Sequence, residues 1–427
     1  MMVRVRIAVV AVVLIAAVAV AQAQLRGHGG PVRALAISQD GKTAISGSFD
    51  TSAIRWSLDK GAASEVLRFH DGAVNAVALL RDRRAASSGE DTRIAIWNPG
   101  ESKPVAVLEG HKAPIAALAV SPDGATLASA SWDHTARLWP LAGGEARVLE
   151  GHKDNVNGVA FTPDGKSVVT AGYDATLRIW PLAGGAPEVV TLPTPLNTVA
   201  IAPDGEIAAA GADGKVYFLT ANGKLRGEVE IGTVPIIAVT MSPDGKLVAA
   251  AGIRGSVAIV DRATRNLERT LVGPGLPVWS VAFFPDSRTL LTGGTDRMIR
   301  RWDAGTGEHL GSVALSAVDD PLAAYAGDPG AEVYRACVAC HTLNGNDGVR
   351  AGPTLAGIFG RKIATLPGYN FSEALRKMNI VWTPETVSKL FEVGPNEYTP
   401  GTKMPEQRIG SPEDRAALMR FLEKVTK

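Results

Sequence analysis

Cysteine is almost absent from this chain. The 427 residues include only two cysteines, Cys337 and Cys340. Two cysteines cannot build the disulfide framework of a small secreted domain. A structural zinc site needs four ligands, and the only further ligand that the sequence offers beside this pair is His341. The pair therefore has to serve a different chemistry.

The chain also lacks an excess of either charge. It has 44 Lys and Arg residues against 43 Asp and Glu residues, a net charge of +1. A nucleic-acid-binding protein carries a basic footprint that this sequence does not show. Nor does the sequence have the lysine excess that would steer it electrostatically to acidic partners. The charge balance thus argues against nucleic acid and identifies no other partner.

Long hydrophobic runs are restricted to the beginning of the chain. Residues 7–20 are uniformly apolar, but 14 residues fall short of the roughly 20 that span a bilayer. Arg4 and Arg6 precede this run, and Ala21-Gln22-Ala23 follows it. This order predicts a secretory signal peptide over residues 1–23, cleaved before Gln24. The exported protein would be attached to the membrane only if this segment were left uncleaved.

The two cysteines belong to a five-residue motif, Cys337-Val338-Ala339-Cys340-His341. Cys-x-x-Cys-His is the attachment motif of c-type haem. On one short helix, two thiols three residues apart can each reach one vinyl group of the porphyrin. The next residue then directs an imidazole at the iron from the same face. The motif predicts one covalent haem c, attached through Cys337 and Cys340 with His341 as an axial ligand.

The last hundred residues resemble class I cytochrome c. The resemblance is carried by residues 352–362 (GPTLAGIFGRK), by Trp382 and by residues 398–404 (YTPGTKM). It implies that Met404 is the sixth iron ligand, and Met/His ligation raises the reduction potential. It also implies that haem is attached outside the cytoplasmic membrane of bacteria. Together with the predicted signal peptide, this places the protein in the periplasm.

The same resemblance implies roles for four residues around the haem. The carbonyl of Pro353 is expected to accept a hydrogen bond from the His341 ring, which fixes the tautomer of that ligand. Arg361, Trp382 and Thr402 are expected to hydrogen-bond a buried haem propionate.

The chain departs from the family at two tyrosine positions. Leu390-Phe391 stands where the family often has a Tyr that hydrogen-bonds the Met sulfur. Phe371 replaces a frequent propionate-binding Tyr.

The middle of the chain repeats itself every 39 to 42 residues. The copies are marked by Asp50, Asp91, Asp133, Asp174, Asp213, Arg254 and Asp296. Each copy holds two runs of alternating β-branched and small residues, separated by a turn such as Ser121-Pro122-Asp123-Gly124. This period with Gly-His and Trp-Asp-like signatures is typical of WD repeats, each of which forms one four-stranded blade. Seven copies predict a seven-bladed β-propeller over residues 24–315, closed into a ring.

Resemblance to the WD-repeat family also implies a hydrogen-bonded His, Ser or Thr, Asp and Trp tetrad in each blade. Four copies have the full set: His28, Ser46, Asp50, Trp56; His70, Ser87, Asp91, Trp97; His111, Ser129, Asp133, Trp139; and His152, Thr170, Asp174, Trp180. A fifth copy has Thr292, Asp296 and Trp302 without a His. Four equivalent sets argue for structural braces and against catalytic triads.

Two copies have lost the tetrad, and the ring needs a closing strand. Leu219 and Val260 stand in place of Trp in the copies around Asp213 and Arg254, so we expect apolar packing alone to hold these blades. Residues 24–26 are too few for a strand, so residues 307–315 are expected to complete the last blade. Each blade would then be contiguous in sequence.

The predicted architecture is a multidomain chain: an all-β seven-bladed WD-repeat propeller followed by an all-α class I cytochrome c domain. Residues 316–329 are acidic and rich in Pro and Gly, which predicts a linker before the cytochrome domain, residues 330–427. Ser411-Pro412-Glu413-Asp414 predicts the start of the last helix, which packs on the first by family resemblance.

These features predict an electron carrier, without catalytic residues, whose propeller is a docking platform for a redox partner protein. With His341 and Met404 on the iron, no substrate would bind there. Two alternatives remain open. The propeller could host a substrate site and pass electrons to the haem, which would make the protein an oxidoreductase. Alternatively, the haem could report redox state in a scaffold or sensor.

Overall fold

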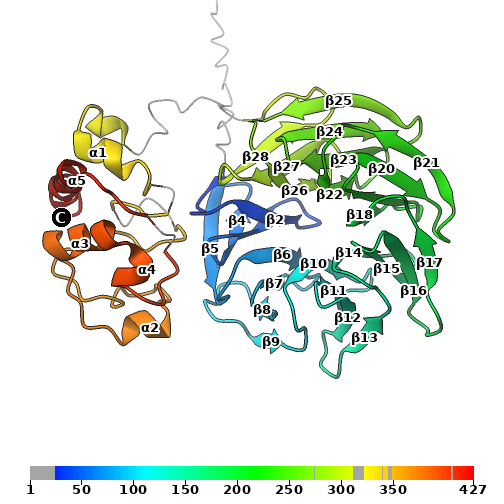
Figure 1. Ribbon diagram of the computed structural model, residues 1–427, viewed down its shortest axis with the longest axis horizontal. Helices are drawn as coiled ribbons and strands as arrows, with labels where there is room; N and C mark the ends of the chain where they lie inside the picture. The colour runs from blue at the N-terminus through cyan, green and yellow to red at the C-terminus, as the bar shows by residue number, and fades with distance from the viewer. Residues whose placement is uncertain (1–24, 274, 311–321, 339, 345–348, 405–406) are drawn as a thin grey trace, which may run out of the picture.

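The computed structural model describes residues 25–273, 275–310, 322–338, 340–344, 349–404 and 407–427. They form two domains that lie side by side, a ring of β-sheets and a smaller helical domain (Figure 1). The predicted signal peptide, residues 1–23, lies outside the described residues. Within the described ranges, no helix is both long and apolar enough to cross a membrane.

The ring consists of seven four-stranded antiparallel sheets, which confirms the predicted propeller. The first three blades contain β2 (Val32–Ile37), β3 (Thr43–Ser48), β4 (Ser52–Ser57) and β5 (Ala62–Arg68); β6 (Val74–Leu79), β7 (Ala85–Gly89), β8 (Ile94–Trp97) and β9 (Ala106–Leu108); and β10 (Ile115–Val120), β11 (Thr126–Ser131), β12 (Thr135–Pro140) and β13 (Arg147–Glu150). The next three contain β14 (Val156–Phe161), β15 (Ser167–Gly172), β16 (Thr176–Pro181) and β17 (Glu188–Thr191); β18 (Leu196–Ile201), β19 (Ile207–Gly211), β20 (Lys215–Leu219) and β21 (Leu225–Glu230); and β22 (Ile236–Met241), β23 (Leu247–Gly252), β24 (Ser256–Asp261) and β25 (Asn266–Val272). The seventh contains β26 (Val278–Phe283), β27 (Thr289–Gly294), β28 (Met298–Asp303) and β1 (Leu25–Arg26).

A buried hydrogen-bond tetrad braces each of the four blades in which the sequence predicted one. In the second blade, His70 Nδ1 lies 3.0 Å from both carboxylate oxygens of Asp91, and Nε2 lies 2.8 Å from Ser87 Oγ. Trp97 Nε1 donates to the same Ser87 oxygen at 2.9 Å. Because a carboxylate only accepts, Nδ1 carries the proton and Nε2 accepts from the serine hydroxyl. His28, His111 and His152 make the equivalent bonds in their blades.

One prediction about the blades that lack a tetrad is wrong. Tyr217 of β20 donates a hydrogen bond through its hydroxyl to Asp213 Oδ2 at 2.6 Å, so this blade does not rest on apolar packing alone. The tyrosine stands two residues before Leu219, the position that Trp occupies in the complete blades. A phenol from the same strand has taken over the role of holding the turn aspartate.

The prediction that every blade is contiguous is also wrong. β1 pairs antiparallel with β28, and Leu25 is buried in the core of the first and last blades. Farther along the same edge of β28, Trp302 forms an isolated β-bridge with His309. Two residues suffice for closure because the segment that follows β28 already covers part of that edge. The ends of the propeller therefore complete its last blade together.

Acid is expected to weaken the propeller between about pH 4 and pH 2. Burial by itself raises the pKa of Asp91, but hydrogen bonds and charge from His70 and Arg93 outweigh it and lower the pKa to about 2. An unfolded aspartate has a pKa of about 3.9, so the stabilisation is complete above that pH and is lost as the pH falls toward 2. Urea unfolding across this range should show falling midpoints. Asp91→Asn should flatten the dependence, whereas exposed Asp59→Asn should leave it intact; equal profiles would contradict the expectation.

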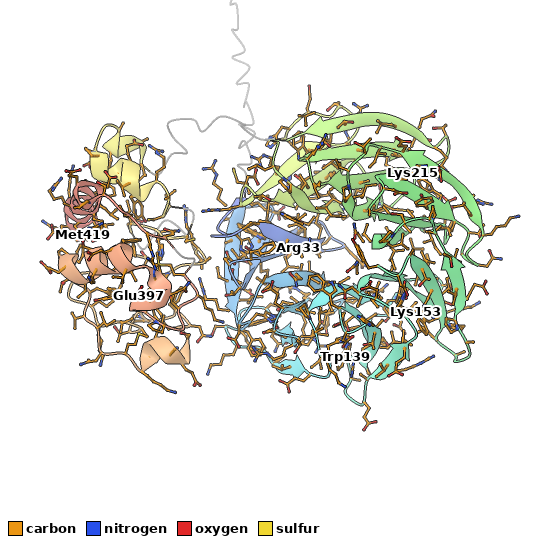
Figure 2. The ribbon with its side chains drawn as sticks, in the orientation of Figure 1. Arg33, Trp139, Lys153, Lys215, Glu397 and Met419 are labelled. Atoms are coloured by element: carbon orange, nitrogen blue, oxygen red, sulfur yellow. The ribbon has the colours of Figure 1, made fainter. Side chains whose placement is uncertain are left out.

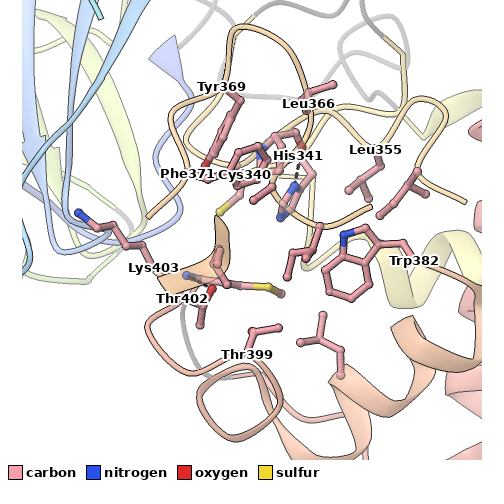
Figure 3. A pocket seen from close by; sticks show the side chains of 18 of the residues that line it. Cys340, His341, Leu355, Leu366, Tyr369, Phe371, Trp382, Thr399, Thr402 and Lys403 are labelled. Atoms are coloured by element: carbon pink, nitrogen blue, oxygen red, sulfur yellow. Dashed lines mark hydrogen bonds between the residues drawn. The ribbon is translucent and has the colours of Figure 1, made fainter. Parts of the chain in front are cut away.

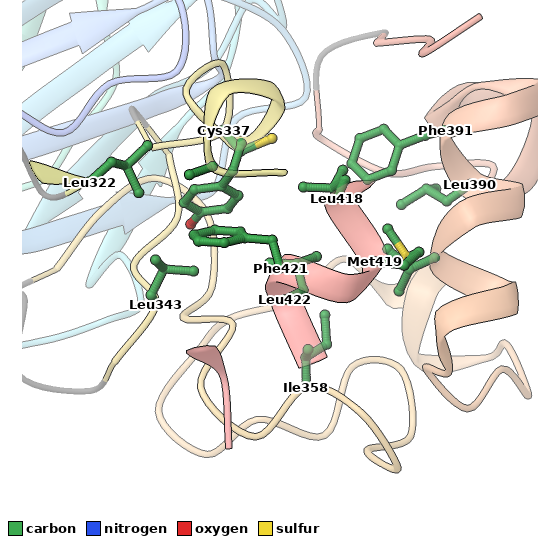
Figure 4. Packing of buried hydrophobic residues seen from close by; sticks show 13 residues of the cluster. Leu322, Cys337, Leu343, Ile358, Leu390, Phe391, Leu418, Met419, Phe421 and Leu422 are labelled. Carbon is green, nitrogen blue, oxygen red and sulfur yellow. The ribbon is translucent and has the colours of Figure 1, made fainter. Parts of the chain in front are cut away.

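The second domain is all-α, as predicted. It contains the 3-10 helix η1 (Ala323–Tyr325) and the helices α1 (Pro329–Tyr334), α2 (Glu373–Arg376), α3 (Pro384–Val393), α4 (Pro395–Tyr398) and α5 (Pro412–Val425). α5 begins where the sequence indicated, with Ser411 Oγ accepting from Asp414 N at 3.1 Å. α5 packs on α1 so closely that a Cβ on Gly330 would lie 2.2 Å from the Ala417 carbonyl oxygen. Leu418 and Phe421 are buried beneath this crossing (Figure 4).

The helical domain begins earlier than the sequence indicated. Leu322 is fully buried in its core, and the Tyr325 ring lies 5.2 Å from the ring of Phe421. Both residues fall in the predicted linker, residues 316–329, of which 316–321 lie outside the described residues. They are apolar anchors in an otherwise acidic, Pro- and Gly-rich stretch, and burial of their side chains ties the end of that stretch to the domain.

Candidate haem site

The predicted haem motif begins three residues after the end of α1 and forms a helical turn. The backbone N–H groups of Cys340 and His341 both donate to the Cys337 carbonyl, at 3.1 and 3.0 Å. The hydroxyl of fully buried Tyr334 donates to the His341 carbonyl at 3.2 Å. These bonds fix the backbone so that the two thiols stand one turn apart, with the imidazole immediately after them.

The ring of His341 is held in one orientation. Its Nδ1 donates to the carbonyl oxygen of Pro353 at 2.7 Å, which is the bond expected from the sequence. Burial lowers the pKa of His341. A neutral ring whose proton stays on Nδ1 leaves the lone pair of Nε2 available to a metal.

The two thiols are buried. Cys337 is 7% exposed and Cys340 is 9% exposed. Burial raises the pKa of each thiol to about 12, so neither side chain carries a charge at neutral pH. A thioether is likewise uncharged, so the surroundings suit cysteines that are covalently attached to a porphyrin.

All eight residues that the sequence singled out line one cavity of about 1520 Å³, its open mouth included: Cys337, Cys340, His341, Pro353, Arg361, Trp382, Thr402 and Met404. Figure 3 shows His341, Trp382 and Thr402 around this space. Leu355, Ile358 and Leu422 contribute apolar walls. A large apolar cavity that gathers two thiols, an oriented imidazole and a thioether sulfur fits a c-type haem.

The residues predicted to bind a propionate make further contacts of their own. Arg361 donates to the carbonyls of Thr354 and Ala356, at 3.0 and 3.1 Å. The hydroxyl of Thr402 accepts from Met404 N at 3.1 Å, which shapes the turn before the methionine. Propionate binding by these residues stays a prediction. Arg361 also braces the loop that follows Pro353, a role that the sequence did not reveal.

The cavity also includes residues that the sequence did not single out for the haem. Tyr369 lines it and donates through its hydroxyl to the Ala351 carbonyl at 2.8 Å. Lys403, inside the YTPGTKM stretch, lines it as well. Arg68 of the propeller reaches the same space. Lys403 could have been found from its place in the YTPGTKM stretch, whereas Tyr369, outside the recognised stretches, and Arg68, in the propeller, give no such signal.

Comparison with family models supports both domains. Residues 81–317 match the model described as IFT122 first beta-propeller, and residues 20–57 match the WD domain, G-beta repeat, model. Residues 327–426 match the cytochrome c model.

Individual relatives match the C-terminal domain. Cytochrome c of Cochliobolus lunatus is 39% identical over 99 residues, which are 23% of this chain and 91% of the relative. Cytochrome c of Arabidopsis thaliana is also 39% identical over 99 residues, 23% of this chain and 88% of the relative. Cytochrome c type-1 of Ascaris suum is 37% identical over 103 residues, 23% of this chain and 88% of the relative.

These matches establish the cofactor and the general activity. The chain binds a covalent c-type haem in the domain that holds Cys337 and Cys340, and it transfers electrons. The WD-type ring in front of that domain indicates interaction with other proteins. The chain therefore belongs both to the propeller family of the first model and to the cytochrome c family, with its haem domain placed after a seven-bladed WD-type ring.

Proposed function

We propose that this protein is a periplasmic electron carrier whose haem is ligated by His341 and Met404, and whose propeller docks a redox partner. The observation that carries the proposal is the cavity of the C-terminal domain. It brings both thiols, the oriented imidazole and the methionine to one apolar space. The bound haem supplies a one-electron change between ferric and ferrous iron.

The chain's own residues prepare the cavity for electron transfer and not for substrate turnover. Pro353 holds the proton of His341 on Nδ1, so the ring keeps one orientation in both oxidation states. Leu355, Ile358 and Leu422 form apolar walls of the cavity, and apolar walls limit the reorganisation of solvent around a haem when its charge changes. With His341 and Met404 both used as ligands, no axial position is left for a substrate.

The propeller offers an aromatic face for a partner. Phe49, Trp132 and Tyr173 directly precede the tetrad aspartates of three blades and are 43%, 38% and 45% exposed. The next residues of the first blade, Asp50 and Thr51, line the haem cavity, so this face adjoins the haem domain. Exposed aromatic residues are typical anchors of protein interfaces. A partner bound on this face would lie near the haem.

Export to the periplasm rests on the sequence of residues 1–23, which lie outside the described structure. A basic start, a short apolar run and a small-residue cleavage site form the pattern of a secretory signal. Fractionation of a bacterial host should find the haem-stained protein in the periplasm, beginning at Gln24. Haem-stained protein in the cytoplasm alone would contradict this part of the proposal.

Electron exchange with the partner gives the test of docking. Cross-linking of the exported protein, followed by mass spectrometry, supplies candidate partners, and stopped-flow mixing measures which of them exchanges electrons with the haem. Trp132→Ala and Tyr173→Ala should lower the second-order rate constant about tenfold, the effect of removing an interface anchor. Their reduction potentials should stay at the wild-type value. Val107→Ala, on outer strand β9, is the control; equal rates for all variants would contradict docking at this face.

A second cavity, in the propeller, favours the alternative in which the propeller hosts a substrate site and passes electrons to the haem. It opens on the same face, has a volume of about 1100 Å³ with its open mouth included, and is lined by Arg33, Asn157 and Trp279, among others. Figure 2 shows Arg33 toward the middle of the ring. A small molecule that reduces the haem with saturable kinetics, and whose effect Trp279→Ala abolishes, would establish an oxidoreductase.

A further inference from the structure

The propeller forms part of the wall of the haem cavity. The cavity lining includes Thr51, in the turn before β4; Ser52, the first residue of β4; and Arg68, the last residue of β5. The backbone of the first blade also touches the second thiol. A Cβ placed on Gly29 would lie 2.1 Å from Cys340 Sγ. The cavity is therefore closed on the side of Cys340 by the propeller, as the position of β5 beside the helical domain indicates (Figure 1).

Arg68 connects the propeller to the segment that supports His341. Its guanidinium donates to the carbonyl of Ala351 at 2.8 Å and to that of Arg350 at 2.5 Å. It also stacks 4.1 Å from the centre of the Tyr369 ring. Asn370 donates back to the Arg68 carbonyl at 3.2 Å. A planar guanidinium can stack on a ring and donate to two carbonyls at the same time, which a lysine cannot do.

The segment held by Arg68 leads directly to the axial histidine. Ala351 N donates to the carbonyl of Gly27 in the propeller at 3.0 Å. Two residues later, the carbonyl of Pro353 accepts the proton of His341 Nδ1. Three consecutive residues thus join the propeller backbone to the group that orients the imidazole.

Lys403 makes the corresponding connection for the axial methionine. It immediately precedes Met404, and its side chain points to the propeller in Figure 3. Its Nζ donates to the carbonyls of Phe69 and His70 and lies 3.5 Å from Asp71 Oδ1. His70 is fixed by the tetrad of the second blade, so these carbonyls form a rigid anchor.

We propose that the end of β5 and the loop after it, residues 68–71, act as a clamp that positions both axial ligands of the haem. Through Arg68 the clamp holds the loop that orients His341, and through Lys403 it holds the turn that presents Met404. The propeller is thereby a structural part of the redox centre as well as a binding platform. This inference rests on the proposed ligation by His341 and Met404.

The arrangement argues against a contact that merely joins two domains. Among the described residues, the hydrogen bonds and the ion pair from residues 68–71 to the helical domain fall on residues 350–351, Asn370 and Lys403. Two of these three sites lie within three residues of Pro353 or Met404. A tether without influence on the haem would not need to concentrate its charged contacts there.

Imidazole binding measures how firmly Met404 is held, because added imidazole binds ferric iron only when the methionine has moved away. Its apparent affinity therefore reports the population of the open state. In the full-length ferric protein, Lys403→Ala and Arg68→Ala should each raise that affinity about tenfold or more, because each removes at least two charge-assisted hydrogen bonds. The reduction potential should shift to lower values in both variants. Lys403→Arg, which keeps charge and reach, should stay near the wild type.

Matched controls come from the propeller itself. Lys215→Ala removes an ion pair with Glu228 on a distant blade (Figure 2), and Arg147→Ala removes an arginine that donates to the Leu182 carbonyl. Both should bind imidazole as the wild type does. If Arg68→Ala fails to fold, Lys403→Ala alone decides. If Lys403→Ala keeps the imidazole affinity and the reduction potential of the wild type, the clamp is overturned. If instead the ferric spectrum of the wild-type protein lacks the sulfur-to-iron band, ligation by Met404 is overturned.

Discussion

The exported chain with both Cys337→Ala and Cys340→Ala is expected to run colourless on a denaturing gel and to show no haem stain. The two thiols are the only cysteines in the chain, so no other side chain can form a thioether. Both are buried in the cavity wall, and their loss leaves any haem there held by non-covalent contacts and axial bonds only. Denaturation removes those contacts. The measurement is the peroxidase stain after electrophoresis, which reports covalently attached haem. It is compared with the colour of the same sample before denaturation, which reports all bound haem.

The two single variants should give an intermediate result. Cys337→Ala and Cys340→Ala should each retain one thioether and a weaker stain. Val338→Ala, between the two thiols, is the control and should stain as the wild type does. The double variant should also lose cooperative unfolding of the helical domain while the propeller transition persists, because the haem fills the core of the helical domain and the propeller only closes one side of its cavity. A stained band from the double variant would refute attachment through these two cysteines.

The parts that the sequence predicted well are those encoded by residues close together in the chain. The motif from Cys337 to His341 fits within a single helical turn, so its spacing already determines which side chains share a face. The tetrads repeat at a fixed period, and each one lies within about 30 residues, from His70 to Trp97 in the second blade. Local patterns of this kind can be recognised without knowing the long-range contacts of the chain.

The failures concern edges that only the complete fold defines. Residues 24–26 are too short to be identified as a strand by any periodicity, yet Leu25 pairs with β28 because the closed ring brings it there. Leu322 was assigned to a linker because the stretch around it is acidic and rich in Pro and Gly, but two apolar side chains, Leu322 and Tyr325, suffice to join that segment to a core. In both cases a long-range contact overrides the composition of the surrounding stretch.

The contact between the domains could not be predicted for a related reason. Arg68 ends an outer strand of a blade, where an arginine is ordinarily a solvated residue, and Ala351 lies 283 residues farther along the chain. Only the relative position of the two domains gives Arg68 a role at the haem. The position of Lys403 next to Met404, in a recognisable stretch, gave a weak indication of a role at the haem. Its partners at residues 69–71 gave none, because they belong to a repeat whose sequence resembles the other repeats.

Met404→Ala is expected to lower the reduction potential by about 0.1 V or more, within the roughly 0.8 V range that axial ligands span. The thioether sulfur favours ferrous iron, and an alanine at this position offers no ligand in its place. The turn that carries the residue should survive, because Thr402 accepts from the backbone N–H of residue 404 and Thr402 N donates to the Thr399 carbonyl. Redox titration of the full-length protein, followed by its absorption spectrum, gives the potential directly.

Met378→Ala provides the matched control for this change. Met378 belongs to the same domain, and among the described residues the cavity lining includes Met404 but not Met378. Its loss should therefore leave the potential and the spectrum unchanged. Met404→Ala should in addition bind imidazole more tightly than Lys403→Ala does, because the clamp variant still has a methionine that competes for the iron. A potential for Met404→Ala equal to that of the wild type would show that another side chain holds the sixth position, and the proposed ligation would be wrong.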